Sequence, residues 1–336
     1  MFELWLTGPV FIAAWAGTEL MRRYGAKRLL DLPNERSSHS RPVPRGGGVA
    51  IVVAFLGGTI TLWWRGLMPD DLLLALLVGG GLIMSVGFWD DHVNLPAQIR
   101  LPLHLSAAAL AVALLGPIQR IPFGEQTWLV PTWLAWPLTV VALTWLVNLY
   151  NFMDGIDGIA AVEAISVSCA ATLVGSVIAT YIPGLIVLAA AALGFLMLNW
   201  PPARIFMGDA GSGFLGYAFG VYLLFATDAD ARFVWVWLIL LAVFWVDATV
   251  TLVRRALAGE RLLAAHRSHA YQLAALRWRS HLRVTLAVLA LNVLVLLPLA
   301  ALAVVRPNAA WFYATAAAIG ITVLVLALGA GHRSTL

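Results

Sequence analysis

Long apolar segments follow one another along almost the whole chain, and this pattern restricts the fold more than any other feature. Each segment has the roughly 17 to 25 apolar residues that a helix needs to cross a bilayer, and the gaps between segments stay below about 30 residues. Of the 336 residues, 61% are hydrophobic and 11% are charged, which is less than half the charge content of soluble proteins. The sequence therefore predicts an all-α polytopic membrane protein.

We predict eleven membrane helices within a single transmembrane domain that covers residues 1–336. They cover residues 2–20, 47–64, 71–88, 101–118, 133–150, 159–179, 183–200, 211–227, 233–253, 284–305 and 309–330. The first segment has no small-residue cleavage site behind it, so we interpret it as a helix and not as a removed signal peptide. The single Cys169 excludes a disulfide framework and a cysteine metal site.

The basic residues predict the orientation. With the N-terminus outside and the C-terminus in the cytoplasm, the internal loops hold 17 of the 21 Lys and Arg residues, as the positive-inside rule requires. The net charge of +4 is then explained by topology, and we expect no nucleic acid as a partner. In this orientation the polar motifs described next all lie at the cytoplasmic face, whereas the external loops are short and poor in functional groups.

Two amides and two carboxylates follow the fifth predicted helix at intervals of three residues. They are Asn148, Asn151, Asp154 and Asp157, with Gly155 and Gly158 between and after the carboxylates. A tighter 3₁₀ turn would align these side chains, and the glycines let the backbone leave the helix and approach a ligand closely. This pattern predicts a membrane helix that ends in a polar loop presenting oxygen ligands.

Further carboxylates stand at the ends of other predicted helices. Asp90 and Asp91 close the third helix, and two adjacent carboxylates near a membrane usually need a metal, an arginine or a proton. A solvated helix end is the alternative. Asp209 stands between Gly208 and Gly211 at the start of the eighth helix, where free N–H groups favour anions. An ordinary helix N-cap is the alternative for Asp209.

Basic residues in two internal loops could contact phosphate. Arg41 and Arg45 approach a run of three glycines on a proline-stiffened segment, although a loop that only sets topology would also be basic. His266, Arg267 and His269 lie in the longest internal loop, where no Cys or carboxylate completes a zinc site.

Asp247 lies inside the ninth predicted helix, where a structural contact and a catalytic role are equally compatible with the sequence.

Acidic and amide oxygens beside Arg and His groups are what Mg²⁺ and a diphosphate need. Mg²⁺ takes one or two protein oxygens and completes its octahedron with phosphate oxygens and water. We therefore expect Mg²⁺ as the cofactor, with Mn²⁺ as a substitute. No Walker loop, GxSxG or HExxH motif is present.

Four stretches together resemble one enzyme family. They are Arg45–Gly48, Asp90–Asp91, Asn148–Gly158 and Asn199–Ser212, in the order found in the polyprenyl-phosphate N-acetylhexosamine-1-phosphate transferases, known as glycosyltransferase family 4. The resemblance covers residues 31 to 272. It implies transfer of a sugar 1-phosphate from a UDP-sugar to undecaprenyl phosphate in the bacterial inner membrane, with release of UMP. A homodimer is left open, because no motif reports on oligomeric state.

The resemblance also implies roles for individual residues. Asp209 would hold Mg²⁺ together with Asn151, and Asp90 and Asp91 match an acidic pair assigned to activating the lipid phosphate. Asp154, Asp157 and Asn199 match residues that line the nucleotide and diphosphate pocket, with Asp154 among the catalytic set. Arg41 or Arg45 stands near a family lysine, and His266, Arg267 and His269 would bind substrate.

The loop that contains His266, Arg267 and His269, called the histidine loop below, differs in sequence from the same loop of the phospho-N-acetylmuramoyl-pentapeptide translocase of this family. That translocase has three consecutive histidines. The chain instead resembles the branch that primes O-antigen and related glycans from UDP-FucNAc or UDP-QuiNAc, and UDP-GlcNAc is the competing donor.

A secondary transporter is the alternative from another class of protein. It would place carboxylates near helix midpoints and show an inverted repeat, whereas here the acids cluster at helix ends on one side and we see no repeat. A purely structural scaffold would not need unpaired acids.

Overall fold

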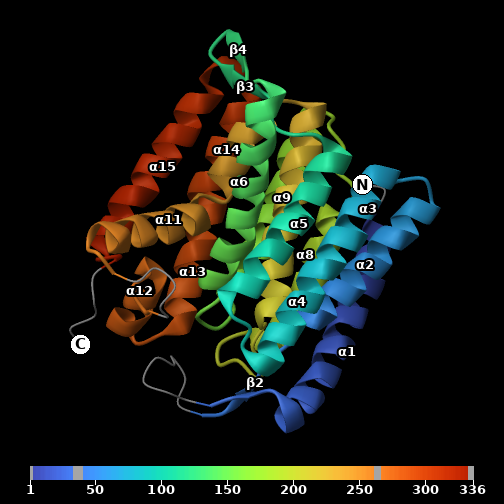
Figure 1. Ribbon diagram of the computed structural model, residues 1–336, viewed down its shortest axis with the longest axis vertical. Coiled ribbons are helices and arrows are strands. Elements are labelled where there is room, and N and C mark those ends of the chain that lie inside the picture. Colours follow the sequence, from blue (N-terminus) through green and yellow to red (C-terminus); the bar gives the residue numbers. More distant parts are fainter. Residues whose placement is uncertain (1–2, 33–40, 261–265, 332–336) are drawn as a thin grey trace.

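The computed structural model describes residues 3–32, 41–260 and 266–331. Most helices run along one direction and form a bundle (Figure 1). The helices are α1 (Leu4–Arg28), α2 (Gly48–Trp64), α3 (Asp70–Leu74), α4 (Gly80–Val93), α5 (Ala97–Leu115), α6 (Thr132–Phe152), α7 (Ile159–Val177), α8 (Leu185–Asn199), α9 (Asp209–Ala229), α10 (Phe233–Leu240), α11 (Ala242–Leu257), α12 (Ala270–Trp278), α13 (His281–Leu291), α14 (Leu297–Val305) and α15 (Ala310–Ala327).

Shorter elements connect the helices. The π-helical stretches η1 (Ala75–Gly79) and η2 (Asn292–Leu296) join α3 to α4 and α13 to α14, and the 3₁₀ turn η3 (Pro307–Ala309) precedes α15. Strands β1 (Leu30–Asp31) and β2 (Val43–Pro44) form one antiparallel pair, and β3 (Arg120–Phe123) and β4 (Gln126–Leu129) form another. A proline immediately precedes α3, α5 and α6, where its missing N–H costs no intrahelical bond.

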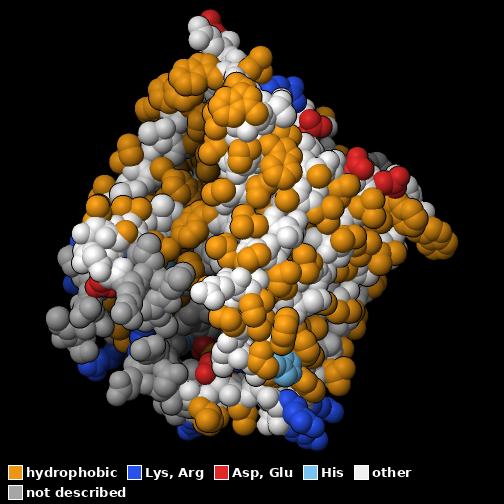
Figure 2. Space-filling view, in the orientation of Figure 1, with side chains coloured by type: hydrophobic (Ala, Val, Ile, Leu, Met, Phe, Trp, Pro, Cys, Tyr) orange, Lys and Arg blue, Asp and Glu red, His pale blue; other side chains and the backbone are white. Residues whose placement is uncertain are grey.

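Seven of the described helical segments are long and apolar enough to cross a membrane, or eight if the bent pair of α10 and α11 is one span. This confirms the prediction of a helical polytopic membrane protein. Every one of the eleven predicted ranges contains helix, but α2 and α8 are shorter apolar helices, so the number eleven stays a prediction. On the face shown in Figure 2, hydrophobic side chains cover most of the middle and upper surface, and Lys and Arg gather mainly near the lower end.

The prediction of one continuous helix over residues 233–253 is wrong. The chain bends by 72° between α10 and α11, at Leu241, whose φ of −93° and ψ of 6° lie outside the α-helical range. No proline or glycine marks the break, so the apolar pattern alone gave no sign of it. After the bend α11 runs across the direction of its neighbours (Figure 1), and its polar residues contact the loop that leads to α12.

Helix α9 forms the centre of the bundle, because most of its side chains are buried against neighbouring helices. Two glycines let α6 approach it closely. A Cβ atom on Gly216 would lie 2.9 Å from the backbone carbon of Leu146, and one on Gly220 would lie 2.8 Å from the side chain of Leu143. Close backbone approach at glycine is a common way for membrane helices to associate.

The segments before α2 and α9 also hold one another. The N–H of Gly47 donates to the carbonyl of Phe206 at 3.0 Å, and the N–H of Gly48 donates to that of Met207 at 2.8 Å. A Cβ on Gly211 would lie 2.5 Å from the Cα of Gly48, where two backbones leave no side chain to move aside. This contact places Arg45 and the start of α9 at the same end of the bundle, opposite the β3–β4 hairpin (Figure 1).

Candidate active site

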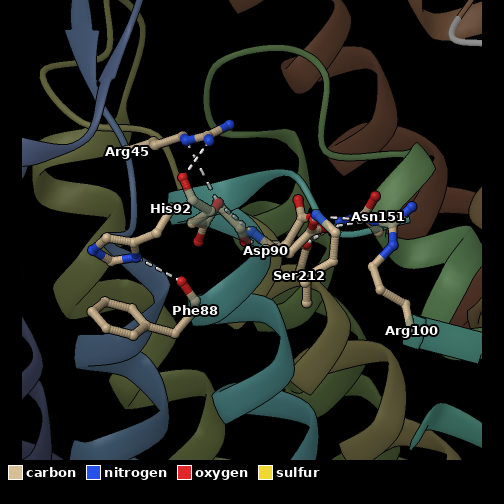
Figure 3. Close-up of polar contacts among 11 residues, drawn as sticks. Arg45, Phe88, Asp90, His92, Arg100, Asn151 and Ser212 are labelled. Carbon is tan, nitrogen blue, oxygen red and sulfur yellow. Dashed lines mark hydrogen bonds and ion pairs between the residues drawn. The ribbon is translucent and has the colours of Figure 1, made fainter. Parts of the chain in front are cut away.

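The acidic pair at the end of α4 packs directly against the first turn of α9. Asp91 is buried, and its Oδ1 accepts a hydrogen bond from the backbone N–H of Asp209 at 3.2 Å. The Arg45 guanidinium donates to the Asp91 carbonyl, and its Nε lies 3.7 Å from Asp91 Oδ1 (Figure 3). Asp91 therefore joins α4, α9 and the segment before α2.

Asp90 contacts different partners. Its Oδ1 accepts from the N–H of Leu95 at 2.5 Å, after Asn94 turns the chain at a left-handed φ of 52°. Its Oδ2 accepts from Nη1 of Arg100 at 2.5 Å, and the same Nη1 lies 3.2 Å from Oδ2 of Asp209. One guanidinium on α5 thus bridges the carboxylates of α4 and α9 (Figure 3).

The amides of α6 reach the same place. Asn151 donates from Nδ2 to the Ser212 hydroxyl at 3.1 Å, and that hydroxyl donates to the Gly208 carbonyl at 3.2 Å. Asn148, one turn earlier, donates to the Thr144 carbonyl at 2.7 Å. Both amides line a cavity of about 650 Å³ that also exposes Asp90 and Asp209.

Side chains from five segments line this first cavity. The polar ones are Asp90, Gln98, Arg100, His104, Asn148, Asn151, Asp209, His266, His269 and Gln272. Only about a third of the Asp209 side chain is exposed, and it faces cationic and amide neighbours. The cavity can therefore hold an anionic ligand with a cation between protein and ligand oxygens.

The two carboxylates of the loop after α6, Asp154 and Asp157, have different surroundings. Burial raises the pKa of Asp154 well above its usual range, and the negative charges of Asp209, Asp91 and Asp157 raise it further. Asp154 therefore binds a proton more readily than an exposed aspartate does. Asp157 turns away from it: its Oδ2 accepts from the N–H of Ala203 at 3.1 Å.

Asp157 lines a second cavity of about 550 Å³. Its Oδ2 lies 3.2 Å from Nδ1 of His281, the first residue of α13. Arg267, Arg279 and Gln272 also line this cavity. Gln272 borders both cavities, so the two lie on either side of the start of α12.

Asn199 supports the loop from behind. Its Oδ1 accepts from the N–H of Gly158 at 2.9 Å, and its Nδ2 donates to the carbonyl of Ile205 at 2.8 Å. Gly158 has a φ of 78°, a conformation that suits glycine. Asn199 is buried and lines neither cavity, so the structure places it as a support for the loop.

The residues of the histidine loop line different cavities. His266 and His269 line the first cavity, whereas Arg267 lines the second. Burial lowers the pKa of His266 to about 4, and the neighbouring His269 and Arg255 side chains contribute to the decrease. His266 is therefore neutral near pH 7. Arg41 is exposed and borders neither cavity.

The donor atoms of the first cavity fit a magnesium ion. Asp209 and Asn151 present a carboxylate and an amide side by side, next to Asp90, and hard oxygen ligands are what Mg²⁺ prefers. Among the residues that the structure describes, no three His, Cys, Asp or Glu side chains form a metal cluster. A site with few protein ligands is what Mg²⁺ uses when phosphate oxygens complete its coordination.

Comparisons with known proteins match the part of the chain that holds most of these residues. The family model "Glycosyl transferase family 4" matches residues 73–227. Residues 73–227 are therefore similar to glycosyl transferase family 4, and we call them the family 4 region. This region contains Asp90, Asn151 and Asp209, which line the first cavity, and also Asp91 and Asp154, which line neither cavity.

Several relatives match less than half of the chain. A probable undecaprenyl-phosphate N-acetylglucosaminyl 1-phosphate transferase of Bacillus subtilis is 30% identical over 43% of this chain and 40% of its own length. A decaprenyl-phosphate N-acetylglucosaminephosphotransferase of Mycolicibacterium smegmatis is 32% identical over 45% of this chain and 38% of its own. A phospho-N-acetylmuramoyl-pentapeptide-transferase of Gluconacetobacter diazotrophicus is 32% identical over 36% of this chain and 37% of its own. The chain thus spans well under half the length of these relatives.

Several residues of the two cavities were not among the predicted site residues. They are Gln98, Arg100, His104, Gln272, Arg279 and His281. For Arg100 a signal existed, because a lone arginine one turn into an otherwise apolar helix needs a carboxylate partner, and the acidic pair stands ten residues earlier. His281 gave no signal, because its relation to Asp157 depends on packing between helices far apart in the sequence.

Proposed function

We propose that this protein transfers an N-acetylated hexosamine 1-phosphate from a UDP-sugar to undecaprenyl phosphate and releases UMP. The observation that carries the proposal is the convergence of Asp90, Asn151 and Asp209 around Arg100 in one cavity. Two carboxylates and an amide beside a cation suit phosphoryl transfer, because catalysis there depends mainly on positioning and on neutralising charge. The family 4 region and the names of its relatives support the same class of reaction.

In the proposed reaction, a phosphate oxygen of undecaprenyl phosphate forms a bond to the phosphorus attached to the sugar. The bond from that phosphorus to the oxygen of UMP breaks, and UMP leaves with the electron pair. Mg²⁺, held by Asp209 and Asn151, would neutralise charge on the phosphates when bound. Asp90 lines the cavity, paired with Arg100, and would accept a proton from the lipid phosphate, whereas Asp91 lines neither cavity and accepts from the backbone of α9. Both direct attack and a covalent enzyme intermediate are compatible with this arrangement.

The donor sugar is the finer part of the proposal. The relatives named above include enzymes for N-acetylglucosamine, which favours UDP-GlcNAc, while the different sequence of the histidine loop favours UDP-FucNAc or UDP-QuiNAc for O-antigen or related glycans.

We place the reaction at the cytoplasmic face of the bacterial inner membrane, with the N-terminus outside. Basic residues at the end of the bundle that holds both cavities support this orientation (Figure 2).

We expect UMP release from purified protein in detergent only when undecaprenyl phosphate, a UDP-sugar and Mg²⁺ are all present. UDP-GlcNAc, UDP-GalNAc, UDP-FucNAc and UDP-QuiNAc are offered separately, with EDTA and with Mn²⁺ as the metal controls. The preferred donor then identifies the branch of the family. No UMP from any donor, in protein shown to be folded, would contradict the proposal and favour a transporter.

Replacing Arg100 by methionine is expected to tighten Mg²⁺ binding about tenfold in the absence of substrates. The Arg100 guanidinium lies between Asp90 and Asp209 and would repel a divalent cation at the same carboxylates, so its removal should add about 1.4 kcal/mol to binding. The measurement is the Mg²⁺ concentration at half-maximal thermal stabilisation. Arg100→Lys, which keeps the charge, is the control. A methionine variant with the wild-type midpoint would show that Arg100 does not oppose the metal.

A further inference from the structure

A buried carboxylate outside both cavities controls the start of α12. Asp247 lies in the second turn of α11, just beyond the 72° bend, and its side chain is almost fully buried. Its Oδ1 accepts from the N–H of Ala270 at 2.9 Å and from the Thr251 hydroxyl at 3.0 Å. Its Oδ2 accepts from the N–H of Tyr271 at 3.1 Å. Both oxygens are thus occupied within the protein.

These hydrogen bonds cap a helix from a distance. Helix α12 begins at Ala270, and the N–H groups of a first helical turn have no partner within the helix. A neighbouring side chain in the sequence usually accepts from them. At α12 a local capping box joins His269 and Gln272, and Asp247, 23 residues before Ala270 on another helix, accepts from the first two N–H groups. The position of α12 therefore also depends on α11 and on the bend before it.

The capped turn carries groups of the first cavity. His269 precedes α12 and lines the cavity, and its Nδ1 is buried 3.5 Å from Oδ1 of Asp247. With Nδ1 facing that carboxylate, Nε2 is the ring nitrogen left for the cavity. The Tyr271 hydroxyl donates to the Phe152 carbonyl at 2.8 Å, which ties the same turn to the end of α6, next to Asn151.

We propose that Asp247 is a positioning residue that holds His269 with Nε2 directed at the substrate phosphates, an inference that rests on the proposed transfer reaction. Asp247 does this in two ways. It fixes the backbone of the first turn of α12, and it faces Nδ1 of His269. It touches no substrate, because it lines neither cavity. Its effect on the reaction therefore passes through His269.

A double-mutant cycle separates this role from a purely structural one. Asp247→Asn is expected to lower kcat/KM for the donor about 10- to 100-fold, the range seen when a residue that orients another is removed. In a His269→Ala background the same change should lower kcat/KM by less than about threefold, because residues acting as a unit are not additive. If Asp247 only stabilised the fold, its effect would multiply with that of His269→Ala, and the proposal would be overturned.

Matched variants keep the test informative. Thr249→Ala, two residues along α11, removes a hydrogen bond from Trp145 and should leave kcat/KM unchanged. Thr251→Val removes one hydrogen bond to Asp247 without removing the carboxylate, and it replaces Asp247→Asn in the cycle if that variant does not fold. His269→Gln replaces His269→Ala if the latter is too slow to measure.

A second readout does not depend on turnover. Hydrogen exchange of the segment that contains Ala270 and Tyr271 should be at least about tenfold faster in Asp247→Asn than in wild type, because two N–H groups lose a charged acceptor. Thr249→Ala should leave this exchange unchanged. Unchanged exchange in Asp247→Asn overturns the positioning role whatever the reaction is. An absence of UMP from wild type with all donors overturns the proposed function instead.

Discussion

Asp209→Asn should abolish UMP release, with a fall in kcat of at least about a thousandfold, while the protein stays folded. Asparagine keeps the size of the side chain and the backbone N–H that donates to Asp91. It removes the negative charge that would hold Mg²⁺ and that faces Arg100 at 3.2 Å. Loss of one preorganised electrostatic group of this kind costs about 10² to 10³ in kcat, and loss of the metal adds to that.

The matched control lies at the other end of the same helix. Asp228 belongs to the last turn of α9 and its side chain is mostly exposed, so Asp228→Asn removes the same charge far from the cavity and should leave UMP release unchanged. Thermal unfolding and gel filtration show whether each variant is folded. A folded Asp209→Asn enzyme with more than a tenth of wild-type kcat would contradict the metal assignment. Retained activity with an unchanged Mg²⁺ requirement would contradict only the choice of Asp209 as the ligand.

The sequence was sufficient to predict several helix boundaries in the bundle. Helix α6 ends at Phe152 and is followed by the polar loop, as the glycines and carboxylates indicated. Helix α9 begins at Asp209 itself, and Asp90 and Asp91 lie in the last turn of α4. These boundaries were predictable because apolar runs give way abruptly to charged residues and glycine, and both signals are local in the sequence.

The arrangement of the cavities was less predictable, since it depends on contacts between distant helices. Asn148 and Asn151 face one cavity and Asp157 the other, although a regular spacing of three residues suggested a single row. Asn199 was predicted to bind substrate and instead supports the loop at Gly158. Nothing in the sequence near Asn199 distinguishes an amide that faces a ligand from one that holds two backbone segments.

The bend before α11 explains why the sequence alone did not predict the role of Asp247. Asp247 was equally compatible with a structural and a catalytic role, because in a straight membrane helix it would face either lipid or another helix. The bend at Leu241 carries it to the start of α12. A single carboxylate then connects the histidine loop to a helix outside the family 4 region, which ends at residue 227.

Gly87→Ala is the second change for which we expect a large effect, because this glycine sets the distance between the acidic pair and Asp209. A Cβ on Gly87 would lie 2.5 Å from the backbone oxygen of Asp209 and 2.5 Å from the N–H nitrogen of Ala210. Backbone atoms in the first turn of a buried helix cannot rotate away, so α4 and α9 must separate. Overpacking of this kind costs about 1 to 3 kcal/mol or more, and a shift of about 1 Å at a reaction centre lowers the rate about 10²-fold.

Gly81→Ala tests the same substitution on the same helix without the contact, because no atom lies within 4 Å of the Cβ it would add. It should raise the unfolding temperature slightly, since alanine favours a helix by about 1 kcal/mol over glycine, and should leave kcat unchanged. Gly87→Ala should lower both the unfolding temperature and kcat. Saturating Mg²⁺ should not restore kcat, because the defect lies in the spacing of Asp91 and Asp209. Equal activity of the two alanine variants would mean that the close approach of α4 to α9 is not required for the reaction.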